Sequence, residues 1–289
     1  MFHIDKSAKD YCLGKMINKT KIIIKKNASK PFSIIGYTIK DYLKGIGHAA
    51  QITFETLLYI FKGQINIKNT VIQMVEVGYR SLPIISLTSF FTGMVLALQV
   101  GSATSGLFNE PVYIGMITGF ALVKELGPVL TAIVVIGRVG AAITAELGTM
   151  KVTEQIDALY TLGTNPVKYL AVPRFLACIL MLPLLTAIAN IIGIYGGLVV
   201  TTLTWDVPST IYMSDILDVM DVNTFWHGFI KSFFFAVILV IVACHKGFKC
   251  SGGAEGVGKA TTSSVMVSMI LILISDYFLT DLLVSLKIS

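Results

Sequence analysis

The chain has 289 residues, of which 54% are hydrophobic and only 14% charged, and its formal net charge is +6. Soluble globular chains carry roughly a quarter charged residues, so this composition excludes an ordinary soluble domain and indicates a lipid environment. The cysteines form no CxxC pair and have no histidine at metal-ligand spacing, which argues against a metal site or a disulfide framework.

The N-terminal part is the most polar part of the chain. Residues 1–30 are rich in Lys and Asn and lack the apolar core of a signal peptide, so we expect a basic, disordered cytosolic extension. Residues 34–61 mix apolar and charged side chains, which predicts an amphipathic helix lying in the membrane interface. A soluble linker is the alternative. The interfacial helix is favoured by four residues on one helical face: Phe54, Leu57, Leu58 and Phe61.

Five apolar blocks follow, each close to the roughly 20 residues that a helix needs to cross a bilayer. They predict an all-α integral membrane protein in which the interfacial helix precedes five transmembrane helices. One domain is expected to cover residues 31–289. The predicted spans are about 81–101, 112–137, 175–202, 224–244 and 261–284.

The distribution of positive charge predicts the orientation of these spans. Twenty of the 23 lysines and arginines lie before the first span or in the two connections on the same side of the membrane. The opposite loops, about 102–111 and 205–222, contain none, and the second carries four aspartates. Since cytoplasmic flanks retain positive charge, we expect a cytoplasmic N-terminus and an outer C-terminus. The basic excess therefore gives no support to nucleic-acid binding.

Three ionisable residues lie well inside the predicted spans: Lys124, Glu125 and Lys231. Such residues are costly in a membrane and usually face a cavity or one another. Adjacent helical residues point about 100° apart, so Lys124 and Glu125 cannot both face one neighbour. We expect Glu125 to pair with Lys231, either as a structural ion pair or in substrate passage. Asp276, nearer the outer face, is expected to be hydrated.

The cytoplasmic stretch between spans two and three, residues 137–174, has the features of a short helix. Thr153 is placed to cap this helix, and Gly163 with Pro166 to end it. The first turn carries Glu154, Gln155 and Asp157, and the apolar face carries Ile156, Leu159 and Tyr160. A helix of this kind suits docking into the groove of a cytosolic partner. A helix lying flat on the membrane is the alternative.

The stretch GAEGVGKAT, residues 253–261, has the glycine and lysine spacing of a phosphate-binding loop. Ala260 stands where that loop needs a magnesium-binding Ser or Thr, so a tight turn before the last helix is the better interpretation. The histidines have no neighbouring nucleophile. We therefore expect no catalytic residues in this chain.

The motifs KELGPVL from Lys124, GRVGAAITAELGTMKVTEQIDAL from Gly137, NPVKYLAVPR from Asn165 and GVGKATTSSV from Gly256 resemble the MlaE (YrbE) family of ABC transporter permeases. The resemblance implies a homodimeric phospholipid permease with no cofactor of its own. ATP would be bound by a cytoplasmic ABC ATPase (MlaF-like), docked on the helix around 154–161. The implied coupling residues are Thr153, Glu154, Gln155, Asp157 and Leu159.

The same resemblance implies a periplasmic MCE-domain protein (MlaD-like) as lipid conduit, with a STAS-domain protein as a further partner. It places a lipid pocket at the dimer interface, at positions that match Leu96, Gln99, Thr104 and Leu107. Position 124 holds Lys where some members have Arg, which keeps the charge and loses the planar fork.

Other functions are open to this chain. An ion-coupled secondary transporter could use the intramembrane lysine and glutamate residues as a relay, and a structural anchor for an outer partner would need neither. A bacterial inner membrane is the expected location, with the plastid inner envelope as the alternative.

Overall fold

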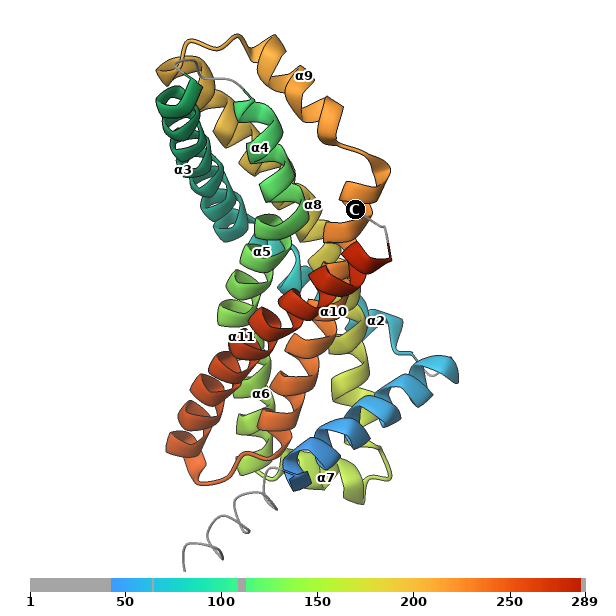
Figure 1. Ribbon diagram of the computed structural model, residues 1–289. Helices are drawn as coiled ribbons and strands as arrows, with labels where there is room; N and C mark the ends of the chain where they lie inside the picture. The colour runs from blue at the N-terminus through green and yellow to red at the C-terminus, as the bar shows by residue number, and fades with distance from the viewer. Residues whose placement is uncertain (1–42, 64, 109–112, 287–289) are drawn as a thin grey trace, which may run out of the picture. The chain divides into compact units, whose positions relative to one another are not determined.

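The computed structural model describes residues 43–63, 65–108 and 113–286. The chain divides into two units, 1–51 and 52–289, and those described helices that are long and apolar enough to cross a membrane all lie in the second. There are five such helices among the described residues, and these residues form no strand. The predicted all-α class with five transmembrane helices is therefore confirmed (Figure 1).

The candidate spans extend beyond the predicted apolar blocks, because polar residues at their ends continue the helices. They cover Ile67–Gly106, Ile114–Val152, Val167–Thr204, Val222–Phe248 and Gly253–Ser285. A further helix occupies residues 43–61. The other elements are α2 (Ile67–Val77), η1 (Tyr79–Ser81), α3 (Leu82–Phe108), α4 (Ile114–Ala121), η2 (Leu122–Leu126), α5 (Gly127–Val135), η3 (Ile136–Gly140), α6 (Ala141–Val152), α7 (Gln155–Thr161), η4 (Val167–Ala171), α8 (Val172–Thr204), α9 (Ser209–Val219), α10 (Val222–Phe248) and α11 (Gly253–Ser285).

Three of these elements, η2, η3 and η4, are single π-helical turns within longer helices. Two of them precede a proline, Pro128 and Pro173, whose ring would clash with the carbonyl four residues earlier in a regular α-helix. That carbonyl belongs to a residue of the π turn in each case, and the wider turn relieves the clash. As a result, the helix continues unbroken from Ile114 to Val152.

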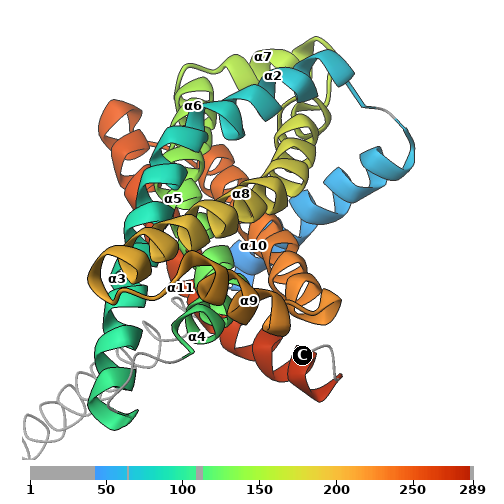
Figure 2. The same cartoon turned by 90° about the horizontal axis from the view of Figure 1, so that it is seen from above.

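α3 and α8 lie side by side and meet through glycine (Figures 1 and 2). A Cβ atom on Gly93 would collide with the carbonyl oxygen of Gly193, and one on Gly196 would collide with that of Phe90. The two backbones are therefore in direct contact, as is common where membrane helices associate through small residues. We call this contact the glycine seam.

The main apolar core lies where α5, α6, α8, α10 and α11 pack together. Fully buried members include Leu182, Leu239 and Ile272. A second cluster forms where α9 packs against α4 (Figure 1). There the Tyr212 hydroxyl donates a hydrogen bond of 3.2 Å to the carbonyl oxygen of Ile194.

Two predicted segments can be compared with the structure: the amphipathic helix before the first span and the turn before the last one. The helix at 43–61 leaves the predicted apolar face exposed, with Phe61 84% exposed, while Ile52 and Thr56 are buried. This arrangement leaves the apolar face free to contact lipid. The predicted turn at 253–261 is wrong, because α11 already begins at Gly253. The reversal lies just before it, at Gly252, whose φ of 94° suits glycine.

Candidate functional site: a buried ion network and an exposed helix

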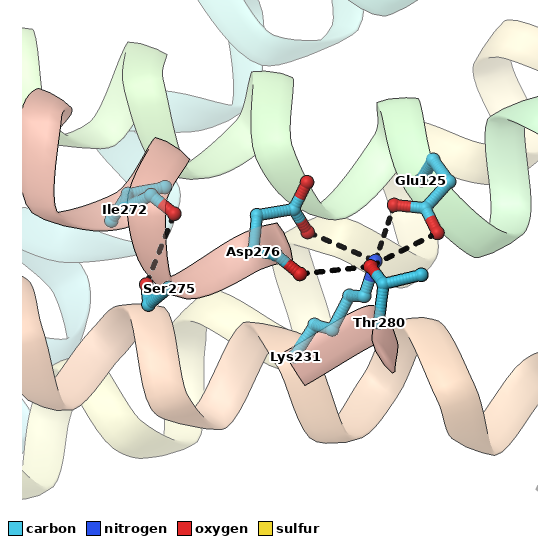
Figure 3. A network of polar contacts seen from close by, with 6 residues as sticks. All are labelled: Glu125, Lys231, Ile272, Ser275, Asp276 and Thr280. Atoms are coloured by element: carbon cyan, nitrogen blue, oxygen red, sulfur yellow. Dashed lines mark hydrogen bonds and ion pairs between the residues drawn. The ribbon is translucent and has the colours of Figure 1, made fainter. Parts of the chain in front are cut away.

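Lys231 of α10 is fully buried and lies between two carboxylates from other helices (Figure 3). Its Nζ forms an ion pair with Glu125 of η2 and a second, 2.9 Å long, with Asp276 of α11. The predicted pairing of Glu125 with Lys231 is confirmed. The expectation that Asp276 is merely hydrated is wrong, because α11 packs along α10 and brings this carboxylate to the ammonium group.

Thr280, one turn beyond Asp276 on α11, extends this network. Its hydroxyl lies 3.4 Å from Glu125 Oε1 and also donates a hydrogen bond of 2.8 Å to the carbonyl oxygen of Asp276. We call Glu125, Lys231, Asp276 and Thr280 the ion network. It joins the second, fourth and fifth spans, and one cation compensates two carboxylates that would otherwise be costly to bury.

Lys124 points elsewhere, as adjacent helical positions require. It is 8% exposed, and its Nζ lies 4.7 Å from the centre of the Phe120 ring, within range of a cation–π contact. His227 was missed by sequence analysis, which noted only that the histidines have no neighbouring nucleophile. It is fully buried one turn before Lys231 on α10. Its spacing of four residues from Lys231 was the available indication.

The residues predicted to line a lipid pocket lie apart from this network, on α3. Leu96 packs against the second apolar cluster, and Gln99 is exposed. Thr104 is buried, and its hydroxyl bonds within its own helix, 3.0 Å from the carbonyl oxygen of Val100. The side chain of Leu107 lies outside the described residues. Among those described, no hydrogen bond or ion pair joins α3 to the ion network.

α7 lies between the second and third spans, as predicted for the docking helix. Thr153 was predicted to cap it, and that prediction is wrong. α6 continues to Val152, and the Thr153 hydroxyl donates a hydrogen bond of 2.8 Å to the carbonyl oxygen of Thr149. Glu154 then turns the chain with a φ of 61°, an uncommon conformation for a residue with a side chain.

The two faces of α7 differ in exposure. Ile156 is buried, and Leu159 packs against the main core. Gln155 and Tyr160 are exposed. Two nested backbone hydrogen bonds, both 3.0 Å long, end the helix. The Gly163 N–H donates to the carbonyl oxygen of Tyr160, and the Thr164 N–H donates to that of Leu159. The predicted end at Gly163 is therefore confirmed.

α7 is also tied to the end of α6. Lys151 Nζ lies 2.8 Å from Asp157 Oδ1, so the predicted first-turn acid serves an ion pair between the two helices. α6 in turn continues the helical run that carries Glu125. At 1.5 Å per residue, this run separates Glu125 from Val152 by roughly 40 Å. One continuous helix therefore connects the end of α6, to which α7 is tied, with the ion network.

Sequence analysis missed two arginines that fasten this run to its neighbours. Arg174 at the start of α8 is buried and lies 2.6 Å from Glu146 of α6. Arg138 of η3 donates a hydrogen bond of 2.6 Å to the Ser81 hydroxyl, at the junction of α2 and α3. Both had been read only as markers of the cytoplasmic side. Arg138 is followed by Val139 and Arg174 by Phe175, and neither neighbour indicates a partner for the arginine.

The sequence model of the family described as Permease MlaE matches residues 70–282. The chain belongs to the MlaE permease family. The match includes all the residues of the ion network and all of α7.

Similar proteins include several probable ABC transporter permeases, among them one from Rickettsia typhi that is 41% identical over 86% of this chain and 95% of its own length. One from Synechocystis is 42% identical over 80% of this chain and 88% of its own length. The probable ABC transporter permease protein ycf63 of Pyropia yezoensis is 36% identical over 84% of this chain and 92% of its own length. The MlaE permease described here is accordingly the membrane subunit of an ABC transporter, which requires an ATPase subunit as partner.

Proposed function

We propose that this MlaE permease moves phospholipid between a bacterial inner membrane and a periplasmic MCE-domain conduit, while a separate ATPase subunit binds and hydrolyses ATP. The proposal rests on the two faces of α7: one face is buried and holds the helix on the bundle, and the other face is exposed. A short helix anchored in this way can fit into the groove of a partner and pass its movement to the bundle.

The charge distribution supports a cytoplasmic position for α7. The connection that carries it contains Lys151 and Lys168, whereas α9, between the third and fourth spans, is acidic and has no lysine or arginine. Since positive charge is retained on the cytoplasmic side, the ATPase would meet α7 there and the conduit would meet the α9 side. The N-terminus is then cytoplasmic and the C-terminus periplasmic, and a STAS-domain protein would bind on the cytoplasmic side.

The exposed face of α3 supports a homodimer. It presents large apolar side chains at helical spacing, Leu87, Phe91, Val95 and Leu98. A second copy of the chain would cover this face, and a lipid would lie between copies near Leu96, Gln99, Thr104 and Leu107. Lys124, Glu125 and Lys231 would serve the gate through which the lipid passes.

A substitution on the exposed face of α7 tests the ATPase contact. Tyr160 is 59% exposed, so Tyr160→Glu should not disturb the bundle. Aromatic residues often dominate such interfaces, and we expect co-purification of the ATPase and ATP-driven lipid transfer in proteoliposomes to fall on the order of tenfold or more. Tyr79→Glu is the matched control, since Tyr79 is 72% exposed and lies outside α7. Unchanged lipid transfer by the Tyr160 variant would refute the docking assignment.

The ion network favours a second candidate, an ion-coupled secondary transporter, because buried acidic groups beside a lysine can form a relay. This candidate predicts lipid movement in proteoliposomes that contain the permease and an ion gradient but no ATPase. Glu125→Gln should abolish that movement. If transport instead requires the ATPase and ATP, the secondary transporter is excluded.

A further inference from the structure

A cavity of about 880 Å³ opens beside α7 and away from the ion network. Three segments meet there: the end of the helix at 43–61, the start of α2, and the loop from α7 to η4. The residues that line it are Tyr59, Gly63, Ile65, Asn66, Ile67, Gly163, Thr164, Asn165, Lys168 and Tyr169. The ion network and the proposed lipid positions on α3 lie outside this cavity.

The charge in this cavity is positive. Lys168 is half-buried, and no carboxylate of the described residues lies within ion-pairing distance of it. The lining residues named above include no aspartate or glutamate. An ammonium group in a cavity wall without a carboxylate partner among the described residues favours an anionic ligand, because such a ligand accepts a charge-assisted hydrogen bond from it.

Neutral hydrogen-bonding side chains line the same cavity as Lys168. The Asn165 amide donates a hydrogen bond of 3.0 Å to the Tyr59 hydroxyl, which leaves the hydroxyl proton available to a ligand. Asn165 Oδ1 accepts a hydrogen bond of 2.9 Å from Val167 N–H, so this side chain is held from both ends. The first turn of α2 adds the positive end of a helix dipole, since α2 begins at Ile67 in the cavity wall.

The rim of the cavity is apolar. Ile65 and Ile67 are 37% and 74% exposed, and the outer face of α2 continues with exposed Val71 and Ile72. A smaller cavity of about 200 Å³ shares Tyr169 with the first, and its other lining residues are both polar and apolar: Asn69, Ile72, Gln73, Leu170, Pro173 and Arg174. The exposed isoleucine and valine side chains therefore give an apolar path away from the cavity along α2.

We propose that the cavity binds the phosphate of an anionic phospholipid headgroup, with Lys168 and Tyr59 as its ligands and an acyl chain lying along α2. A soluble phosphate would use the same donors, but it would gain nothing from the apolar rim. This site is distinct from the lipid positions on α3. Because Gly163 and Asn165 belong to the loop that ends α7, an occupied site would restrain the docking helix. The inference does not require that the transported substrate is a lipid.

Native mass spectrometry of the delipidated full-length chain in detergent tests the proposal. Phosphatidylglycerol, phosphatidylcholine and sn-glycerol 3-phosphate are titrated separately. We expect phosphatidylglycerol to bind at least tenfold more tightly than either of the others, and Lys168→Gln to weaken its binding on the order of tenfold, as expected for a lost hydrogen bond to a charged group. Lys168→Arg should restore most of the affinity. Tyr59→Phe should weaken it less than Lys168→Gln does.

Lys68→Gln is the matched control. Lys68 is exposed on α2 close to the cavity, and its side chain is not among the lining residues. Equal losses from Lys68→Gln and Lys168→Gln would overturn the site in favour of diffuse surface attraction. Equal affinity for glycerol phosphate and phosphatidylglycerol would overturn the lipid assignment. Unchanged binding by a Lys168→Gln variant that elutes and melts like the wild type would overturn both.

Discussion

The glycine seam and the ion network hold neighbouring helices of one bundle by opposite means. At the glycine seam, α3 and α8 touch through backbone atoms, and no side chain lies between them at Gly93 or Gly196. At the ion network, η2, α10 and α11 are joined by long side chains that meet at Lys231. Backbone contact has one geometry, whereas an ionic contact can be loosened by the loss of one charge. We therefore expect α3 and α8 to move as one body, and α10 and α11 to shift against η2.

The largest effect is expected from Lys231→Met, which removes the cation from the ion network. Glu125 and Asp276 would then face each other without compensation, and breaking a buried ion pair from one side costs about 3–5 kcal/mol. Thermal unfolding in lipid nanodiscs, followed by far-UV circular dichroism, measures the loss. Adding Glu125→Gln and Asp276→Asn to Lys231→Met should restore most of it. A triple variant as unstable as the single one would show that charge is not what holds these helices.

A smaller loss is expected from Gly93→Leu in the glycine seam. The new side chain would meet the backbone of α8, and overpacking of this kind costs about 1–3 kcal/mol. Gly140→Ala is the control, since a Cβ atom there finds its nearest neighbours at an ordinary 3.8 Å. That variant should be neutral or stabilised by up to ~1 kcal/mol, as alanine is the better helix former. If the two variants unfold alike, the seam is looser than direct backbone contact requires.

The smallest effect is expected from Thr280→Val, which removes one hydroxyl group from the ion network. The hydroxyl makes a long contact of 3.4 Å with Glu125, so its loss should cost less than ~1 kcal/mol. Thr88→Val on α3 controls for the lost intrahelical bond, because Thr88 bonds only to its own helix, 2.9 Å from the carbonyl oxygen of Ile84. The difference in melting temperature between the variants isolates the Glu125 contact. A zero difference would remove Thr280 from the network.

The five spans could be predicted because each is a local block of apolar residues. The Glu125–Lys231 pair could be predicted because an unpaired charge inside a membrane is energetically costly. A long block of apolar residues indicates a span, and a charge inside a span usually has a partner of opposite sign. Asp276 could not be assigned in this way, because its partner depends on how α11 packs along α10, and a sequence pattern does not report the packing of two helices.

Thr153 illustrates a second limit. A threonine before a run of acids fits the start of a helix, and it also fits the end of a preceding one. The choice depended on how far α6 continued beyond the apolar block, which hydropathy does not report. Proline alone could not predict the π turns, since Pro128 and Pro173 follow one and Pro183 lies inside α8 without one. η3 has no such proline, and nothing in its residues indicated a wide turn.

Each π turn holds one residue more than a regular turn would, and this has a consequence for how such a chain can change over generations. Deleting one residue from η2 would close the wide turn into a regular one, so α4 would keep its face toward α9. Deleting one residue from α5 would instead rotate the helix on one side of the gap by about 100°. Lineages of this protein should therefore tolerate gaps of a single position at the π turns and purge them in the regular helix between Gly127 and Val135.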